Sequence, residues 1–169
     1  ILTEEDVERL GTSGKMNPPL RTTPDVEALR VGLFDGTIDA IATDHAPHSP
    51  ESKDVSLSAA PPGMLGVETV ASVIWTEFVE TGLMTLDRFV ALLSTEPARI
   101  AGLTSQGQHL KTGAVANIAI FDPQERWVPE RGSLQSKSAN NPWQGKDLIG
   151  RVRHTICRGK LVVADSVLV

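Results

Sequence analysis

An aspartate and two histidines, Asp44, His45 and His48, lie within five residues of one another. They follow residues 38–42, a short and nearly all-apolar run that predicts a strand buried on both faces. Pro47 prevents regular structure from continuing beyond them. In parallel α/β folds the loops after the carboxyl ends of the strands converge on one crevice, where ligands bind. The pattern therefore predicts a polar site at the end of this strand.

The residues alone leave three interpretations of these side chains open. In the first they are structural: His45 caps the strand end, His48 is solvated and Asp44 accepts hydrogen bonds from nearby backbone N–H groups. In the second the three side chains bind a metal between them, although adjacent side chains on an extended backbone point apart and zinc needs three or four ligands. In the third Asp44 is one metal ligand whose partners come from elsewhere, which fits the pattern better.

Composition limits the class of protein. The 169 residues are 40% hydrophobic and 22% charged, which is ordinary for a soluble globular protein. A net charge of −5 without Lys/Arg clusters argues against a nucleic-acid partner. No apolar run approaches the roughly 20 residues of a membrane span, and no signal-peptide pattern opens the chain. Cys157, the only cysteine, excludes an intrachain disulfide and fits a reducing cytoplasm; we expect a buried strand thiol.

Capping residues and apolar spacing predict several helices in the first two thirds of the chain. Their apolar stripes, which include Leu29, Val67 and Leu86, are expected to lie in the core. Residues 49–66 form a long connection, rich in proline and glycine, of the kind that forms lids or binding loops. Its Lys53 is expected to be solvated. The predicted helices run from Thr3 to Gly11, Thr23 to Gly36, Val67 to Gly82, Thr85 to Leu93 and Glu96 to Gly102.

The pattern changes near residue 104, after which strands replace helices. Strands are predicted at residues 115–121, 126–128, 151–157 and 160–163, with a tight hairpin turn at Arg158-Gly159 between the last two. His109 and His154 stand alone in this part and are expected to be structural or solvated.

Three sequence blocks carry a resemblance to a known family. They are residues 15–21 (Lys-Met-Asn-Pro-Pro-Leu-Arg), 42–48 (Ala-Thr-Asp-His-Ala-Pro-His) and 60–69 (Ala-Pro-Pro-Gly-Met-Leu-Gly-Val-Glu-Thr). In wording and spacing they resemble the C-terminal part of bacterial dihydroorotases of the amidohydrolase superfamily. Residues 113–118 and 141–143 (Asn-Pro-Trp) resemble the small β domain of the same superfamily.

The resemblance implies an α/β fold: a C-terminal fragment of a metal-dependent (β/α)8 TIM barrel plus a small composite β domain. Residues 1–104 would be the barrel part, with the strand before Asp44 as the eighth barrel strand, and residues 105–169 the β domain. The chain starts at Ile1 without a methionine and close to a helix start. We therefore expect it to be cut from a longer protein.

The resemblance also implies an activity and the residues that perform it. Dihydroorotases interconvert dihydroorotate and N-carbamoyl-L-aspartate in pyrimidine biosynthesis, with one or two zinc ions. By motif match, Asp44 would bind zinc and carry the proton in catalysis. Asn17 and His48 would hold the substrate, and the backbone at Pro62 and Gly63 would contact its ring.

This chain departs from the family pattern in one respect. The family's other metal ligands, a His-x-His pair, an acidic or carboxylated-lysine ligand and two further histidines, precede the part seen here. One carboxylate cannot hold a catalytic zinc, so the fragment alone is expected to be inactive, and a fragment without bound metal fits this expectation. The parent is expected to be a cytoplasmic homodimer. Two alternatives stay open: a metal-free scaffold subunit for aspartate carbamoyltransferase, and a hydantoinase or allantoinase relative, over which the blocks favour dihydroorotase.

Overall fold

The computed structural model describes residues 1–169 and divides them into two compact units. Unit 1 comprises Ile1–Ile38, Ala42–Val70 and Val128–Asp147; unit 2 comprises Asp39–Ile41, Ala71–Trp127 and Leu148–Val169. Each unit thus combines segments that are far apart in the sequence. The division into residues 1–104 and 105–169 follows family resemblance rather than compactness, and it stays a prediction.

Capping residues predicted the end of α1 before Gly11 and both ends of α2 to within one residue, whereas α1 begins at Asp6 without a side-chain cap from Thr3. Thr22 and Asp25 form a capping box, in which the Thr22 hydroxyl accepts from the Asp25 N–H at 3.4 Å and the Asp25 carboxylate accepts from the Thr22 N–H at 3.2 Å. The cap lies one residue earlier than predicted. Leu29 is 54% exposed, so the predicted core stripe is wrong at this position. The helical segments are α1 (Asp6–Leu10), η1 (Gly11–Gly14), α2 (Thr23–Asp35), α3 (Pro50–Lys53) and η4 (Arg131–Ser133).

Unit 2 holds two longer helical runs, in which α-helical and π-helical turns follow one another. The two helices predicted after Thr85 form one continuous run. Val67 precedes the first run and is 58% exposed, and Leu86 is also exposed, which corrects their predicted place in the core. None of the helices is both long and apolar enough to cross a membrane. The runs are α4 (Val70–Ile74) with η2 (Trp75–Val79), and α5 (Leu86–Val90) with η3 (Ala91–Thr95) and α6 (Glu96–Ile100).

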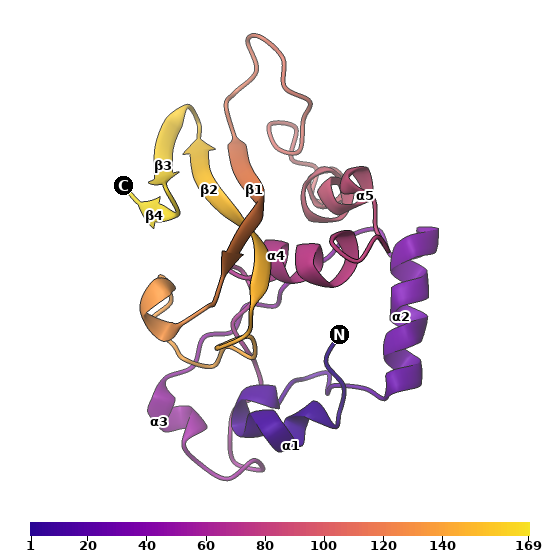
Figure 1. Ribbon diagram of the computed structural model, residues 1–169, viewed down its shortest axis with the longest axis vertical. Coiled ribbons are helices and arrows are strands. Elements are labelled where there is room, and N and C mark those ends of the chain that lie inside the picture. Colours follow the sequence, from indigo (N-terminus) through magenta and orange to yellow (C-terminus); the bar gives the residue numbers. More distant parts are fainter. The chain divides into compact units, whose positions relative to one another are not determined.

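The strands of unit 2 form one antiparallel sheet in the order β1-β2-β3-β4 (Figure 1). The two strands predicted at residues 115–121 and 126–128 are a single strand. Its register shifts between Asp122 and Arg126, because Pro123 has no N–H for the ladder and the strand bulges there. Arg158 and Gly159, both left-handed, form the predicted turn. The strands are β1 (Ile118–Trp127), β2 (Leu148–Cys157), β3 (Lys160–Ala164) and β4 (Val167–Leu168).

Two further predictions about strands differ from the structure of this chain. Residues 38–42 belong to no sheet; the Ile38 N–H donates to the Gly32 carbonyl at 2.9 Å and the Ile41 N–H to the Leu92 carbonyl at 3.0 Å. Ala42 is exposed, so this segment is not buried on both faces. A buried strand needs paired neighbours, and the strands of this chain pair only with one another. Cys157 is exposed, because it is the last residue of β2 before the turn.

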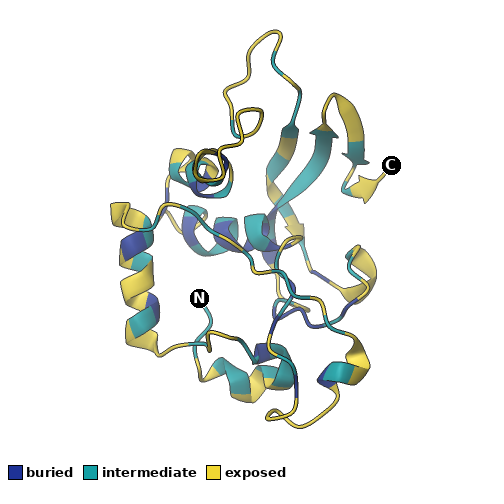
Figure 2. Cartoon of the chain, turned by 180° about the vertical axis from the view of Figure 1, so that it is seen from behind, coloured by how far each residue is buried: buried dark blue, intermediate teal, exposed yellow.

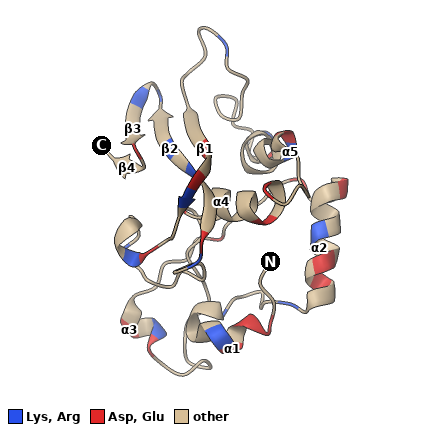
Figure 3. Cartoon of the chain, viewed as in Figure 1, with Lys and Arg blue, Asp and Glu red and all other residues tan.

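Acidic and basic residues lie on adjoining stretches of β1 and β2 (Figure 3), and their side chains form ion pairs. Glu125 accepts from Arg151 at 3.1 Å and from Arg153 at 3.0 Å, and Arg153 also bonds Asp165 at 2.6 Å. The hydrogen bond from Arg153 is the main reason that the pKa of Asp165 is lowered. These ion pairs connect β1, β2 and the turn after β3 across their polar face.

An aromatic cluster forms part of the core of unit 2. The rings of Trp75, Phe89 and Phe121 lie with their centroids 5.1–5.6 Å apart. The two helical runs carry further buried residues, which are the dark blue stretches of these helices in Figure 2. Gly150 of β2 has a φ of +83° and lies so close that an added Cβ would overlap the Phe121 ring. Backbone and ring therefore approach each other here only because residue 150 has no side chain.

We predict that Gly150→Ala destabilises unit 2 by about 2–5 kcal/mol, because left-handed strain and steric overlap with Phe121 add together. Gly113→Ala is the matched control, since Gly113 has a φ of +87° but no atom within 4 Å of the added Cβ. The free energy of unfolding, measured by denaturant titration, checks both variants. Equal losses in the two would show that Phe121 contributes nothing.

Candidate functional site

All five predicted site residues lie in unit 1. Asp44 lies just after residues 38–42 and has a φ of +42°, in the left-handed region that few residues other than glycine adopt. Its side chain is exposed and makes no hydrogen bond or ion pair within the chain. Strained backbone of this kind costs about 1–3 kcal/mol and occurs preferentially at functional sites. Asp44 is thus held in an unusual conformation that leaves both carboxylate oxygens available to a ligand.

His45 has a structural role. Its Nδ1 accepts hydrogen bonds from the backbone N–H groups of Gly66 at 3.2 Å and Val67 at 3.3 Å, just before α4 begins. These contacts correspond to the structural interpretation of His45, in which it binds backbone instead of a metal. No group of three or more His, Cys, Asp or Glu side chains converges on a point where a metal ion could bind.

His48 lies against the backbone of the third sequence block. Its Nε2 lies 3.0 Å from the Pro62 carbonyl oxygen. Because a carbonyl oxygen can only accept, Nε2 is the donor, and Nδ1 of the neutral ring carries a lone pair. A Cβ added to Gly63 would lie 3.1 Å from His48 Nε2. The structure therefore brings together three of the five predicted residues, namely His48, Pro62 and Gly63.

Gly63 occupies a position that no other residue can fill without strain. Its φ is +130°, and an added Cβ would lie 2.6 Å from the Cβ of Ala46. Sequence reasoning attributed this glycine to close approach by the substrate. The structure shows a different close approach, between the chain segments around Ala46 and Gly63. Pro62, beside it, is exposed and accessible to a ligand.

Asn17 is exposed on the loop after η1, and its side chain makes no hydrogen bond within the chain. The loop is nevertheless tied to the rest of the site. The Lys15 carbonyl accepts from the Gly63 N–H at 2.8 Å, and the Lys15 ammonium donates to the Ser58 carbonyl at 2.9 Å. Asn17 therefore follows, by two residues, a direct connection to the segment that carries Pro62 and Gly63.

Sequence reasoning missed two residues of this region. Lys53, expected to be solvated, is only 8% exposed, and its ammonium donates to the carbonyls of Thr12, Pro61 and Gly63 at 2.9 Å each. Asn140 is 2% exposed and contacts the segments around Ala46 and Gly63. Both act through contacts with residues distant in the sequence. No local pattern could have identified them, apart from the location of Asn140 beside the Asn-Pro-Trp motif.

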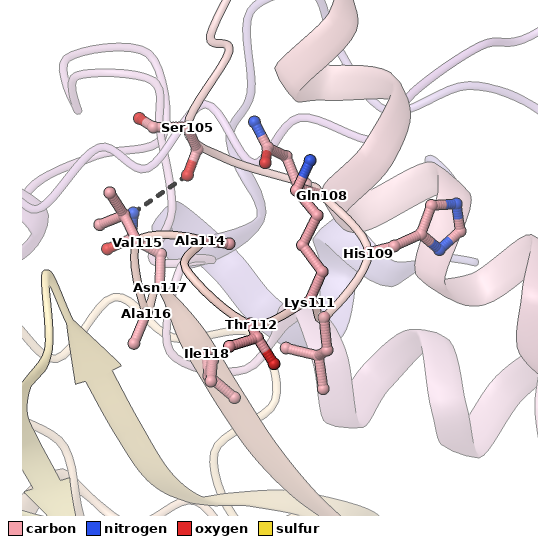
Figure 4. Close-up of a pocket in the computed structure, with 12 residues that line it drawn as sticks. Ser105, Gln108, His109, Lys111, Thr112, Ala114, Val115, Ala116, Asn117 and Ile118 are labelled. Carbon is pink, nitrogen blue, oxygen red and sulfur yellow. Dashed lines mark hydrogen bonds between the residues drawn. The ribbon is translucent and has the colours of Figure 1, made fainter.

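Unit 2 contains a separate pocket of about 440 Å³. The loop before β1 curls around it, and within it the Asn117 amide donates to the Ser105 carbonyl at 3.1 Å (Figure 4). The His109 ring points away from the centre of this loop in the same view. None of the predicted site residues lines the pocket. Its lining comes from Ser105, residues 107–112 and residues 114–118.

Comparison with known proteins identifies the family. Residues 2–162 match the family model described as the amidohydrolase family. The chain belongs to this family. Its mixed α/β fold also matches solved structures of the family over its whole length: a D-hydantoinase (dihydropyrimidinase) from Thermus sp. superposes with a TM-score of 0.90 at 28% identity, covering 100% of this chain and 38% of that protein. An L-hydantoinase (dihydropyrimidinase) from Arthrobacter aurescens gives 0.90 at 27% identity, covering 99% and 38%.

Within the family, the chain is homologous to dihydroorotases. It is 48% identical to the dihydroorotase of Citrifermentans bemidjiense over 161 residues, which are 95% of this chain and 37% of that protein. It is 43% identical to the dihydroorotase of Streptomyces coelicolor over 168 residues, 99% of this chain and 39% of that protein. The predicted resemblance is confirmed. The chain spans well under half the length of these relatives.

We predict that His45→Ala lowers the free energy of unfolding by about 1–3 kcal/mol, because the Gly66 and Val67 N–H groups lose their acceptor. His109→Ala, which removes an exposed histidine remote in sequence, is the control and should leave the free energy of unfolding unchanged. Denaturant titration measures both variants. Equal stability of His45→Ala and the unmodified protein would show that these two hydrogen bonds contribute nothing.

Proposed function

We propose that this chain is the C-terminal part of a dihydroorotase, a zinc-dependent cyclic-amide hydrolase that interconverts dihydroorotate and N-carbamoyl-L-aspartate. Relatives named dihydroorotase, 43–48% identical over most of the chain, support this proposal. In the whole protein residues 38–42 would be the eighth strand of a (β/α)8 barrel. In this chain they belong to no sheet, which is consistent with partner strands supplied by the rest of the protein.

The conformation of Asp44 is the observation that carries the proposal. A carboxylate that binds a metal and exchanges a proton needs its oxygens free of internal partners. Asp44 meets this condition. It is exposed, its side chain makes no hydrogen bond within the chain, and its backbone is left-handed at the end of residues 38–42. A scaffold subunit without catalysis has no need of such a residue, which favours the enzyme over the metal-free alternative.

The residues of this chain fit zinc only as part of a larger ligand set. Catalytic zinc needs about three protein ligands, and Asp44 supplies one carboxylate. The remaining ligands would come from the part of the protein outside this chain, so residues 1–169 alone would not catalyse the reaction. When bound, zinc lowers the pKa of water towards about 7. Asp44 would accept the proton of the attacking water and deliver it to the leaving amide nitrogen of the ring.

The substrate side of the site would use hydrogen-bonding groups of side chains and backbone. The Asn17 amide offers both donors and an acceptor to the ring amide. The Pro62 carbonyl, with one lone pair bonded by His48, has a second lone pair for a ring N–H. His48 would face the substrate carboxylate through Nδ1, which donates when both ring nitrogens carry hydrogen, because Nε2–H is already used on the Pro62 carbonyl. Gly63 would serve by keeping this backbone close to Ala46.

A hydantoinase is the second candidate, because the matching solved structures bear that name. Their identity to this chain is 27–28%, whereas the dihydroorotases reach 43–48% over a similar stretch. The difference favours dihydroorotase. Following the family resemblance, we place the whole protein in the cytoplasm as a homodimer, with contact to aspartate carbamoyltransferase as a further possibility for the assembly.

The full-length protein tests the proposal. We expect an intact mass more than twice the 18.1 kDa of this chain, bound zinc, and hydrolysis of dihydroorotate. Asp44→Asn should lower kcat about 10³-fold or more and weaken zinc binding, because the amide can neither accept the proton nor replace the anionic ligand. Steady-state kinetics and metal analysis measure these effects.

Asp54→Asn is the control for this substitution, since Asp54 is an exposed aspartate of the following loop. It should keep both zinc and turnover. Full activity in Asp44→Asn would remove the assigned role of Asp44. Hydrolysis of a hydantoin but not of dihydroorotate by the unmodified protein would favour the second candidate.

We predict that His48→Ala raises KM for dihydroorotate about 10- to 100-fold, the size expected for one hydrogen bond to a charged group. Zinc content should stay near normal, because His48 contacts backbone and is not proposed as a ligand. His48→Gln, which restores an N–H donor, should show a smaller rise in KM. Loss of zinc in His48→Ala, without a change in KM, would contradict this assignment.

A further inference from the structure

Lys53 is a buried cation without an acidic partner. Its ammonium uses its three N–H groups on three backbone carbonyls, those of Thr12, Pro61 and Gly63. Burial lowers the pKa of Lys53, and the nearby charge of Lys15 lowers it further. A buried charge is costly unless hydrogen bonds replace its hydration. Here three carbonyls, one from η1 and two from residues 61–63, replace the water that would otherwise bind the ammonium.

These three carbonyls belong to, or directly precede, the segments that carry the proposed substrate contacts. Thr12 lies in η1, directly before the loop that carries Asn17, and its hydroxyl donates to the Lys53 carbonyl at 2.7 Å. Pro61 and Gly63 flank Pro62, whose carbonyl bonds His48. The Lys53 ammonium therefore joins the Asn17 loop to the Pro62 segment at a single point.

Asn140, which lies far from Pro62 in the sequence, also fixes the segment that carries Pro62. Its amide nitrogen donates to the Ala46 carbonyl at 2.9 Å and the Gly63 carbonyl at 3.1 Å. Its amide oxygen accepts from the His48 N–H at 3.3 Å, and its backbone carbonyl accepts from the Leu65 N–H at 3.0 Å. Every hydrogen-bonding group of the Asn140 side chain thus contacts either the loop that carries Ala46 and His48 or the segment that carries Pro62 and Gly63.

The two residues meet at one acceptor, the Gly63 carbonyl, which takes a bond from each. Because the Gly63 N–H also donates to Lys15, this residue has no free backbone group. The position of Pro62 is consequently determined on both sides. We propose that Lys53 and Asn140 are positioning residues, which fix Pro62 and His48 for binding of the cyclic amide substrate. This inference rests on the proposed function.

No hydrogen bond connects either residue to the Asp44 carboxylate. Their loss should therefore affect substrate binding more than the chemical step. In the full-length protein we expect Lys53→Met, which keeps the apolar stem without the donors, to raise KM for dihydroorotate at least tenfold. We expect kcat to stay within about threefold and zinc content to be unchanged. The lost interaction would stabilise bound substrate and transition state equally, and such a loss raises KM without lowering kcat.

Lys15→Met is the matched control, because it removes a neighbouring ammonium that makes one hydrogen bond and leaves the three-carbonyl site intact. It should change KM by less than twofold. Asn140→Asp, which keeps an acceptor for His48 but places a charged oxygen against two carbonyls, should raise KM as Lys53→Met does. An unchanged KM, or a fall in kcat at constant KM, would overturn the inference.

Chemical rescue provides a readout that general destabilisation would not give. Lys53→Ala removes the three carbons and the nitrogen that propylammonium contains. Added propylammonium should therefore bring KM back towards the unmodified value. Tetramethylammonium at equal concentration has the charge without N–H donors and should not. Equal effects of the two cations would count against a hydrogen-bonded site at Lys53.

Amide hydrogen exchange separates this inference from the proposed function. In Lys53→Met the amides of Gly63 and Leu65 should exchange at least tenfold faster, and in Lys15→Met they should not. If the unmodified protein does not act on dihydroorotate, the proposed function fails, and the exchange rates still decide whether Lys53 fixes the Pro62 segment. Unchanged exchange in Lys53→Met would reject the positioning role.

Discussion

Two buried donors, the Lys53 ammonium and the Asn140 amide, share the Gly63 carbonyl, and unit 1 depends on this arrangement. Unit 1 contains little regular structure and few buried apolar side chains, among them Val26, Ala60 and Leu65. Such a unit cannot gain much from apolar burial alone. Its loops are held instead by hydrogen bonds from side chains of one loop to backbone carbonyl groups of another. A polar network in which every group is hydrogen-bonded specifies a single conformation.

Unit 2 obtains its order in a more familiar way. Trp75, Phe89 and Phe121 form an aromatic core, and the Thr76 hydroxyl accepts from the Ile149 N–H at 2.8 Å, which joins η2 to β2. Burial patterns along such elements are periodic, because one face of a helix or strand meets the core. Part of the packing of unit 2 therefore follows from local spacing, whereas the loop contacts of unit 1 join residues that are far apart in the sequence.

This difference explains what the sequence could predict. Capping residues located α2 to within one residue, and the Arg158-Gly159 pair located the hairpin turn, because these signals act within a few residues. The strand at residues 38–42 was predicted from its apolar run, but a strand requires hydrogen-bonded neighbours, which this chain does not provide. A local pattern can prescribe extended backbone and cannot supply its partners.

The same reasoning applies to the site. The sequence motifs identified Asp44, His48, Pro62 and Gly63 as site residues, and the last three lie together in the structure. Lys53 was taken for a solvated side chain, because a charged residue in a loop normally is one. Only the positions of the Thr12, Pro61 and Gly63 carbonyls reverse that expectation, and those positions depend on the fold of the whole unit.

The site also shows why its residues differ so much in their internal contacts. A group that must exchange protons and ligands works best without internal hydrogen bonds, and Asp44 has none. Backbone that must present a carbonyl to a small rigid ring works best when it cannot move, and every carbonyl from Pro61 to Gly63 is bonded. Each carbonyl held in place in advance reduces the ordering that substrate binding would otherwise require. The fixed carbonyls and the unpaired carboxylate are therefore two complementary requirements of one site.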